Sequence, residues 1–210
     1  MSSALFLALD GLDGTGKSTQ CRLLADWLRR RGQPVVTCAE PGGTALGNLL
    51  RDLLLHHPCE RTSLSEAFLF MASRAQLVAE VIQPALAAGN IVISDRFLLS
   101  TVVYQGHAGG LDPDMLWQVG RIATGSLDPN RTLVLDLPPD LAQARRAGPA
   151  DRVESRGLDF HARVRTGFLA EAQRYPERIR VIDATPSIEI VHRRICDEIE
   201  ASLVGTESSE

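Results

Sequence analysis

A glycine-rich segment close to the N-terminus carries the residue types that hold a phosphate group. Gly11, Gly16, Lys17 and Ser18 satisfy the pattern G-x-x-x-x-G-K-[ST]. In that pattern backbone N–H groups surround the phosphates, the lysine reaches the β- and γ-phosphates, and the hydroxyl can coordinate Mg²⁺. An apolar run over residues 5–9 precedes the loop, and a helical pattern follows it. A tight turn without a ligand is the alternative, but the complete strand, loop and helix favour phosphate binding.

A second group of polar residues follows an apolar run in the middle of the chain. The run IVISDR ends in Asp95 and Arg96. Asp95 suits the Mg²⁺ shell, and Arg96 can bind an anionic group with two hydrogen bonds. The alternative is an Asp-Arg pair that caps the next helix. Beyond it, Ser100, Tyr104 and Gln105 offer two hydroxyls and an amide to a phosphate, a sugar or a base.

The longest helical pattern covers residues 64–86. Its apolar positions predict a buried stripe made of Leu64, Phe68, Met71, Ala75, Val78 and Ile82. On the neighbouring face, Phe70 and Arg74 lie one turn apart and can present a ring and a guanidinium to a flat ligand. The alternatives are a core phenylalanine and a solvated arginine.

Five apolar runs alternate with helical patterns and predict the fold that positions these groups. The runs cover residues 5–9, 34–38, 90–94, 132–137 and 179–182. Such alternation predicts a parallel sheet with helices on both faces, a three-layer α/β/α domain. Ligands bind at the carboxyl ends of strands in these sheets. The polar residues that follow the strands, and that we expect to converge, are Asp10, Glu40, Asp95, Arg96 and Asp136.

Composition narrows the class of protein. The chain has 210 residues and a net charge of −4, which fits one domain and disfavours broad electrostatic binding to nucleic acid or an anionic membrane. Its four cysteines are dispersed without a C-x-x-C pair, as is typical of reduced thiols rather than disulfides or zinc ligands. We find neither a signal peptide nor a membrane span and expect a cytoplasmic protein. We expect the polar end, residues 205–210, to be disordered.

One charged stretch interrupts the regular patterns. Residues 145–157 read RRAGPADRVESRG, with Gly148 and Pro149 between two helical patterns. This composition predicts an exposed mobile loop. Its arginines can close over a phosphate, and a solvated charge run that joins two helices is the alternative.

Six motifs in one order give the chain a family resemblance. They are GLDGTGKSTQ, EPGGT, LRDLLL, DRFLLSTVVYQG, LVLDLPPD and DRVESRGLDF. With them the chain resembles the thymidylate kinases. The resemblance implies a P-loop NTPase fold with a five-stranded parallel sheet, in one domain over residues 1–204 with a short lid at about 145–157. It also implies transfer of the γ-phosphoryl group of ATP to dTMP with Mg²⁺, and a homodimer.

The resemblance further implies a role for individual residues. Those that bind ATP are Gly11, Leu12, Asp13, Gly14, Thr15, Gly16, Lys17, Ser18, Thr19 and Arg145. Those that bind dTMP are Asp13, Glu40, Pro41, Arg51, Phe70, Arg74, Arg96, Ser100, Tyr104 and Gln105. Phe70 would stack on thymine, Arg74 would contact its carbonyl, and Tyr104 would disfavour a 2′-hydroxyl. The catalytic set is Lys17, Arg96, Arg146, Arg152 and Asp13, and the metal set is Ser18 and Asp95.

Gly14 distinguishes two arrangements of the family. Some members carry an arginine at this position, whereas a small residue there leaves the cation to the lid. The chain therefore resembles the bacterial type, in which Arg146 or Arg152 would carry the catalytic charge. It departs from the family at Ala39, where arginine is common, and in the altered lid arginines.

The sequence leaves two other functions open. One is a P-loop kinase that acts on a different deoxynucleotide or on a deoxynucleoside. The other is a P-loop switch ATPase, for which LVLDL at residues 133–137 would be the Walker B strand. The chain has no N-K-x-D motif for guanine and no basic nucleic-acid face, which disfavours the switch.

Overall fold

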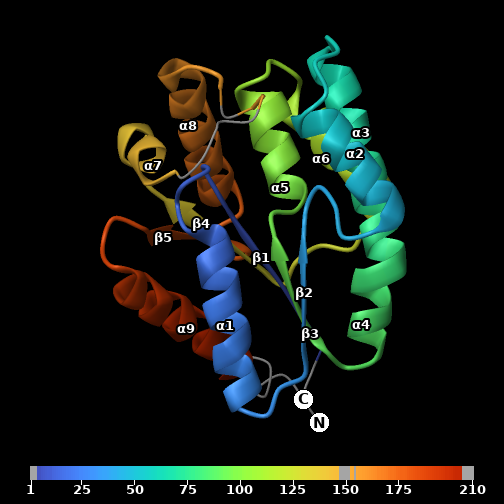
Figure 1. Cartoon of the computed structure of the whole chain (residues 1–210). Helices are drawn as coiled ribbons and strands as arrows, with labels where there is room; N and C mark the ends of the chain where they lie inside the picture. The colour runs from blue at the N-terminus through green and yellow to red at the C-terminus, as the bar shows by residue number, and fades with distance from the viewer. Residues whose placement is uncertain (1–3, 147–151, 154, 205–210) are drawn as a thin grey trace.

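Five parallel strands form the centre of the molecule. The computed structural model describes residues 4–146, 152–153 and 155–204, and its sheet has the order β2-β3-β1-β4-β5 (Figure 1). The strands are β1 (Leu5–Gly11), β2 (Val35–Ala39), β3 (Ile91–Asp95), β4 (Arg131–Asp136) and β5 (Ile179–Asp183). The prediction of a five-stranded parallel sheet is therefore confirmed, with small differences at the strand ends.

Helices cover both faces of this sheet, as predicted. The helices of one face are α1 (Lys17–Arg30) and α9 (Ile188–Val204), which pack against each other in front of the sheet in Figure 1. The opposite layer contains α3 (Ser63–Leu77), η1 (Val78–Ile82), α4 (Gln83–Ala87), α5 (Leu98–Thr101), η2 (Val102–His107) and α6 (Pro113–Thr124). The remaining helices are α2 (Ala45–Leu55), which packs on α3, and α7 (Pro139–Arg145) and α8 (Leu158–Arg174).

The central strand is buried along its whole length. Leu7 and Leu9 of β1 share a buried cluster with Leu24 of α1, whereas Phe6 belongs to the cluster that contains Val102 of η2. Because both faces of the sheet are covered, consecutive positions have to be apolar. This explains why the strands read as continuous apolar runs.

In the described part of the chain, no helix is both long and apolar enough to cross a membrane.

The helix predicted over residues 64–86 is present as α3, η1 and α4, with η1 a π-helical turn. The buried residues of the predicted stripe include Met71, Val78 and Ile82. The prediction is wrong for Leu64 and Phe68, whose side chains are 41% and 52% exposed. The helix α3 packs against α2 and α6, and these contacts leave one apolar side of α3 at the surface.

The segment 145–157 differs in part from the exposed loop that its composition predicts. Arg145 is the last residue of α7, and Val153 is 8% exposed and packs within the larger buried cluster. These two positions are therefore held by regular structure and by the core. Residues 147–151 and 154 of the predicted lid, and the predicted disordered tail at 205–210, lie outside the described residues.

The contact between α8 and η2 depends on a glycine. A Cβ atom at Gly167 would lie 2.7 Å from Cβ of His107 and 3.1 Å from Cγ1 of Val103. We expect Gly167→Ala to lower the free energy of unfolding by about 1–3 kcal/mol through overpacking, although alanine alone would favour a helix by up to about 1 kcal/mol. Thermal unfolding followed by circular dichroism measures the change. An unchanged or higher Tm would show that the contact has room for a methyl group.

Candidate active site

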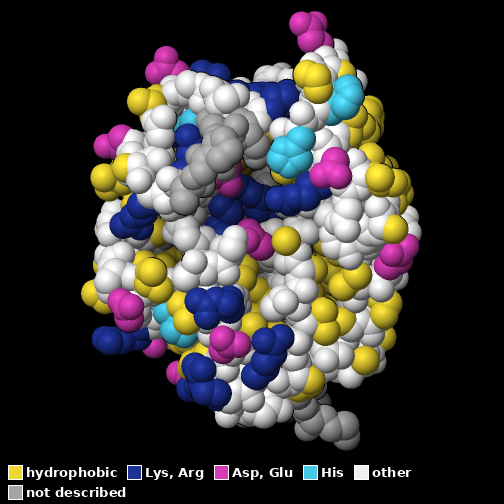
Figure 2. Space-filling model, in the orientation of Figure 1, with side chains coloured by type: hydrophobic (Ala, Val, Ile, Leu, Met, Phe, Trp, Pro, Cys, Tyr) yellow, Lys and Arg dark blue, Asp and Glu magenta, His cyan; other side chains and the backbone are white. Residues whose placement is uncertain are grey.

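A pocket of about 650 Å³ opens at the carboxyl ends of the central strands. Figure 2 shows it as a hollow in which Lys and Arg side chains gather. The predicted site residues that line it are Asp13, Gly14, Gly16, Lys17, Ser18, Thr19, Glu40, Pro41, Arg51, Phe70, Arg74, Asp95, Arg96, Ser100, Tyr104, Gln105, Arg145 and Arg146. Groups far apart in sequence meet here because parallel strands bring their carboxyl ends to one edge of the sheet.

The loop between β1 and α1 has the backbone geometry of an anion site. Gly11, Gly14 and Gly16 have φ angles of 137°, 87° and 93°, which residues with a side chain rarely adopt. Helix α1 starts without a side-chain cap from the described residues, so its first N–H groups can bind phosphate oxygens. Nζ of Lys17 donates to the carbonyl of Leu12 at 2.8 Å. The loop thus holds its lysine close to its own backbone.

Gly14 is the point at which the phosphate loop touches α7. A Cβ atom at Gly14 would lie 2.0 Å from the carbonyl oxygen of Ala142 and 3.1 Å from Cγ of Arg146. A side chain therefore does not fit at this position while α7 occupies its place. Arg146, whose Cγ lies beside this position, lines the same pocket.

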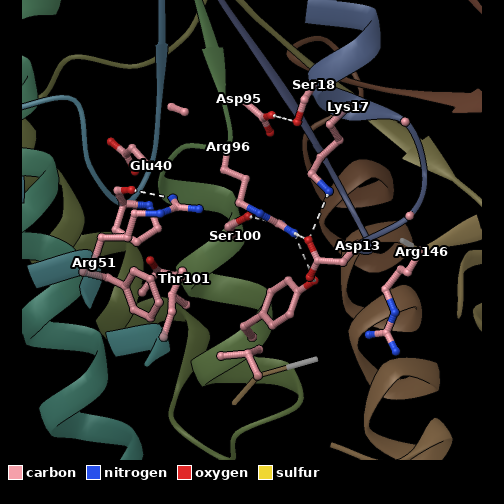
Figure 3. Close-up of a pocket in the computed structure, with 18 of the residues that line it drawn as sticks. Asp13, Lys17, Ser18, Glu40, Arg51, Asp95, Arg96, Ser100, Thr101 and Arg146 are labelled. Atoms are coloured by element: carbon pink, nitrogen blue, oxygen red, sulfur yellow. Dashed lines mark hydrogen bonds and ion pairs between the residues drawn. The ribbon is translucent and has the colours of Figure 1, made fainter. Parts of the chain in front are cut away.

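Arg96 joins the end of β3 to the phosphate loop (Figure 3). Its Nη2 donates to Oδ1 of Asp13 at 2.5 Å, and its Nη1 donates to the carbonyl of Gly11 and to Oγ of Ser100, each at 3.0 Å. Its backbone N–H donates to the carbonyl of Leu9 at 2.9 Å. Arg96 has a φ angle of 72°, a conformation that costs about 1–3 kcal/mol and persists where the surroundings enforce it. The four contacts supply that enforcement.

These charges shift the pKa values of the groups around them. Burial alone would raise the pKa of Asp13, but the positive charges of Arg96 and Lys17 outweigh burial and lower it. Burial, together with the charge of Arg96, lowers the pKa of Lys17 although Asp13 opposes the shift. Burial also raises the pKa of Asp10, whose Oδ1 accepts a hydrogen bond from Ser100. Asp13 is therefore a carboxylate at neutral pH and can accept hydrogen bonds from a hydroxyl group.

A buried ion pair forms the other end of the pocket. Arg74 and Glu40 are 1% and 5% exposed, and Nε of Arg74 donates to Oε2 of Glu40 at 2.7 Å. Nη2 of Arg74 donates to the carbonyl of Phe97 at 3.2 Å and to Oγ1 of Thr101 at 3.1 Å. Burial raises the pKa of Glu40 to about 7, although the charge of Arg74 opposes this. Since a buried charge is costly to leave unpaired, these partners fix the direction of the guanidinium.

The remaining predicted acceptor residues lie around this pair. Phe70 is half-buried and precedes Arg74 by one turn of α3, as predicted. Arg51 donates from Nη1 to the carbonyl of Pro41 at 2.8 Å. Tyr104 of η2 is buried, and its hydroxyl lies 3.5 Å from Oδ2 of Asp13. An aromatic ring, two guanidinium groups and a phenol therefore line the same pocket.

Ser18 and Asp95 offer oxygen ligands beside the phosphate loop. Oγ of Ser18 donates to Oδ2 of Asp95 at 2.5 Å (Figure 3). Oδ2 of Asp10 is buried without a hydrogen-bond partner among the described residues. The described residues contain no cluster of three or more His, Cys, Asp or Glu side chains suited to a metal. Mg²⁺ commonly takes one or two protein oxygens, with phosphates and water completing its shell, so this pair fits a magnesium ion.

Two arginines of the segment 145–157 line the pocket, and they are Arg145 and Arg146. Figure 3 places Arg96 and Arg146 on either side of Asp13. Arg145 donates to the carbonyl oxygens of Ala184 and Thr185 at 2.8 and 2.9 Å. Arg145 therefore ties the end of α7 to the loop after β5.

Arg152 contacts α2 and α3 instead. Its Nε donates to the carbonyl of Leu54 in α2 at 3.2 Å, and its Nη2 pairs with Glu66 of α3. Arg152 does not line the pocket, nor do Gly11, Leu12 and Thr15 of the loop.

Two polar contacts at or beside this site were not predicted. Glu66 is 1% exposed and contacts Arg152, and Thr101 contacts Arg74. Glu66 lies four residues before Phe70 on α3, so the helical spacing that singled out Phe70 and Arg74 also places Glu66 on their side. No sequence spacing indicated Thr101, because its hydrogen bond with Arg74 depends on how α5 packs against α3.

The chain is similar to known proteins over nearly its whole length. A family model for thymidylate kinase matches residues 9–195. A curated thymidylate kinase from Symbiobacterium thermophilum is 46% identical, over 93% of this chain and 94% of its own length. A curated thymidylate kinase from Rhodopirellula baltica is 48% identical, over 90% of this chain and 77% of its own length. The crystal structure of thymidylate kinase from Ehrlichia chaffeensis gives a TM-score of 0.79 at 31% identity and covers 94% of this chain and 99% of that one. With this fold, this phosphate loop and these relatives, the chain belongs to the thymidylate kinase family.

Proposed function

We propose that this protein transfers the γ-phosphoryl group of ATP to dTMP, which gives dTDP and ADP for dTTP synthesis. One observation carries the proposal: the phosphate loop and the end of the pocket that contains Phe70 and Arg74 belong to one cavity. Asp13 and Arg96 lie between the two ends and contact each other. A donor nucleotide and an acceptor nucleotide can therefore meet there with their phosphates facing.

The donor end suits ATP. The left-handed glycines and the start of α1 offer N–H groups to the phosphates, and Lys17 lies 3.6 Å from Asp13 at the floor of the loop. In our proposal Lys17 leaves its contacts with the protein and binds the β- and γ-phosphates. Ser18 and Asp95 would hold Mg²⁺, which when bound neutralises negative charge on the phosphates.

The acceptor end suits a pyrimidine deoxynucleotide. We propose that Phe70 stacks on the base, that Arg74 donates to its carbonyl oxygen, and that Arg51 and Arg96 bind the acceptor phosphate. Tyr104 is buried beside Asp13, and its ring would leave no room for a 2′-hydroxyl. A site whose buried donors already point in fixed directions discriminates against ligands that leave them unpaired.

Phosphoryl transfer then requires alignment and charge neutralisation rather than a covalent intermediate. The transferred group carries charge on its equatorial oxygens in a loose transition state, so cations held in place lower the barrier. Arg96 approaches from β3 and Arg146 from the end of α7, which supports a pair of cations around the transferred group. Since Gly14 has no space for a side chain, we assign the additional catalytic charge to Arg146.

The substrate assignment can be tested by a panel of acceptors. We expect ATP to be converted to ADP at a rate that depends on dTMP and is highest for dTMP among deoxynucleoside monophosphates and deoxynucleosides. A coupled assay for ADP, with Mg²⁺ present, measures this. A preferred acceptor other than dTMP would favour another P-loop kinase, and slow hydrolysis independent of any acceptor would favour a switch ATPase.

Substitution of the two candidate catalytic arginines, Arg146 and Arg152, should affect kcat differently. We expect Arg146→Ala to lower kcat by more than about tenfold with little change in KM for dTMP, because the lost charge acts in the transition state. Arg152→Ala provides the comparison, since Arg152 contacts Glu66 and Leu54 rather than the pocket, and its kcat should fall less. Steady-state kinetics on both variants measure this difference. Full turnover in Arg146→Ala would remove that residue from the catalytic set.

We further propose that the protein forms a homodimer through α2, α3 and α6. These three helices pack together, and each exposes a large apolar side chain: Leu49 is 69%, Phe68 52% and Ile122 83% exposed. Exposed apolar side chains on adjacent elements are typical of protein interfaces. The same surface explains why α3 is apolar on more than its buried side.

We expect Phe68→Asp to weaken this dimer and give a monomer at micromolar concentration, because the substitution would bury a charge in an apolar interface. Light scattering coupled to gel filtration measures the mass. Ile188→Asp is the matched control, since Ile188 is 54% exposed but lies at the start of α9 on the other side of the sheet. A wild-type protein that is already monomeric would contradict the proposal.

We also infer one catalytic domain and a reducing, cytoplasmic location. All four cysteines are free, and burial raises the pKa of Cys38 and Cys196 to about 11. Such thiols are poorly reactive, which suits a protein without disulfides.

A further inference from the structure

Glu66 carries a buried charge that has no role in the proposed phosphoryl transfer. It is 1% exposed and lies on α3, one turn before Phe70. Its Oε1 pairs with Nη2 of Arg152, and its Oε2 lies 3.3 Å from Nη2 of Arg156. Two arginines around one buried carboxylate offset the cost of burying the charge. This explains how the charge is tolerated but not what it does.

The third partner of Glu66 belongs to the pocket. Nε2 of Gln105 donates to Oε2 of Glu66 at 3.4 Å. Gln105 is 2% exposed, comes from η2, and lines the acceptor end of the pocket. The carboxylate is therefore in contact with a side chain that a bound base can reach.

The chemistry of this contact fixes the amide of Gln105. A carboxylate between two guanidinium groups accepts hydrogen bonds and has none to donate. The amide of Gln105 therefore has to turn its NH₂ group toward Glu66. Its Oε1 is then the atom left to a ligand, so the pocket presents a hydrogen-bond acceptor at this position.

We propose that Glu66 is a positioning residue that sets the choice of base by holding the amide oxygen of Gln105 toward the pocket. This inference rests on the proposed function. An acceptor at this point matches a pyrimidine whose ring nitrogen N3 carries a hydrogen, as in thymine and uracil. It opposes cytosine, whose N3 is itself an acceptor. A mismatched buried polar group is left unpaired, and such mismatches give strong discrimination.

Glu66→Gln tests this directly because it should reverse the amide. Arg152 contacts Oε1 of residue 66, and Nη2 of Arg156 lies 3.5 Å from the same oxygen. The amide oxygen can serve both arginines at that position, although Arg156 gives up its 3.3 Å contact with Oε2. The introduced NH₂ would then take the position that faces Gln105. Gln105 would then accept with Oε1 and turn its NH₂ into the pocket. We expect the ratio of kcat/KM for dTMP to that for dCMP to fall by about tenfold, measured with the two nucleotides in competition. Arg74 is unchanged, so part of the preference for dTMP remains.

Glu171→Gln is the matched control. Glu171 is 2% exposed and accepts from Trp117 at 3.0 Å and contacts His107 at 2.8 Å, but it lies outside the pocket. Loss of this buried carboxylate should lower Tm without a change in the dTMP to dCMP ratio. An equal fall in the ratio for both variants would mean that general destabilisation, not Glu66, changes base choice.

A double-mutant cycle shows whether Glu66 acts through Gln105. In a Gln105→Ala background, Glu66→Gln should have no further effect on the ratio. An unchanged ratio in Glu66→Gln, or an undiminished effect in the Gln105→Ala background, would overturn the inference. If Glu66→Gln does not fold, Glu66→Asp withdraws the carboxylate from Gln105 and is judged by the same ratio. A wild type that does not use dTMP would instead refute the proposed function.

Discussion

The contact between Arg96 and Asp13 ties the end of β3 to the phosphate loop and so holds the two halves of the pocket together. β1 and β3 are neighbours in register, with Leu9 opposite Asp95, so the residue after β3 emerges beside the phosphate loop. Arg96 turns back at a φ of 72° and binds both the loop backbone and the carboxylate of Asp13. The strained backbone and the short ion pair fix the distance between the two halves of the pocket.

The cations of the pocket contact acceptors of the protein itself. Lys17 contacts Leu12 and Asp13, and Arg74 is bound by Glu40. These contacts hold the two cations in place at partly desolvated positions. In the proposed function, substrate binding would exchange one oxygen partner for another, which requires less reorganisation than collecting flexible side chains from solvent. Gln105 is likewise held by a protein acceptor, because its Nε2 donates to Oε2 of Glu66.

Much of this could be predicted from the sequence, and the failures have physical causes. The continuous apolar strands and the glycine-rich loop predict the sheet and the loop between β1 and α1, because these features are local. Phe70 and Arg74 followed from helical spacing. Leu64 and Phe68 were misplaced, because one helix carries both a core face and an exposed apolar face and periodicity does not say which surface meets the sheet. The partner of Arg152 depends on tertiary packing and could not be predicted from spacing.

A crystal structure with dTMP and a non-hydrolysable ATP analogue would show how the two nucleotides lie relative to Arg96 and Asp13. If Arg96 and Asp13 join the two halves of the site, both nucleotides should occupy the one pocket, with the guanidinium of Arg96 within hydrogen-bond distance of the acceptor phosphate. Asp13 should then lie between the acceptor sugar and the phosphate loop. The account would be contradicted by an acceptor phosphate bound away from Arg96, or by two nucleotides whose facing phosphates are held by separate sites.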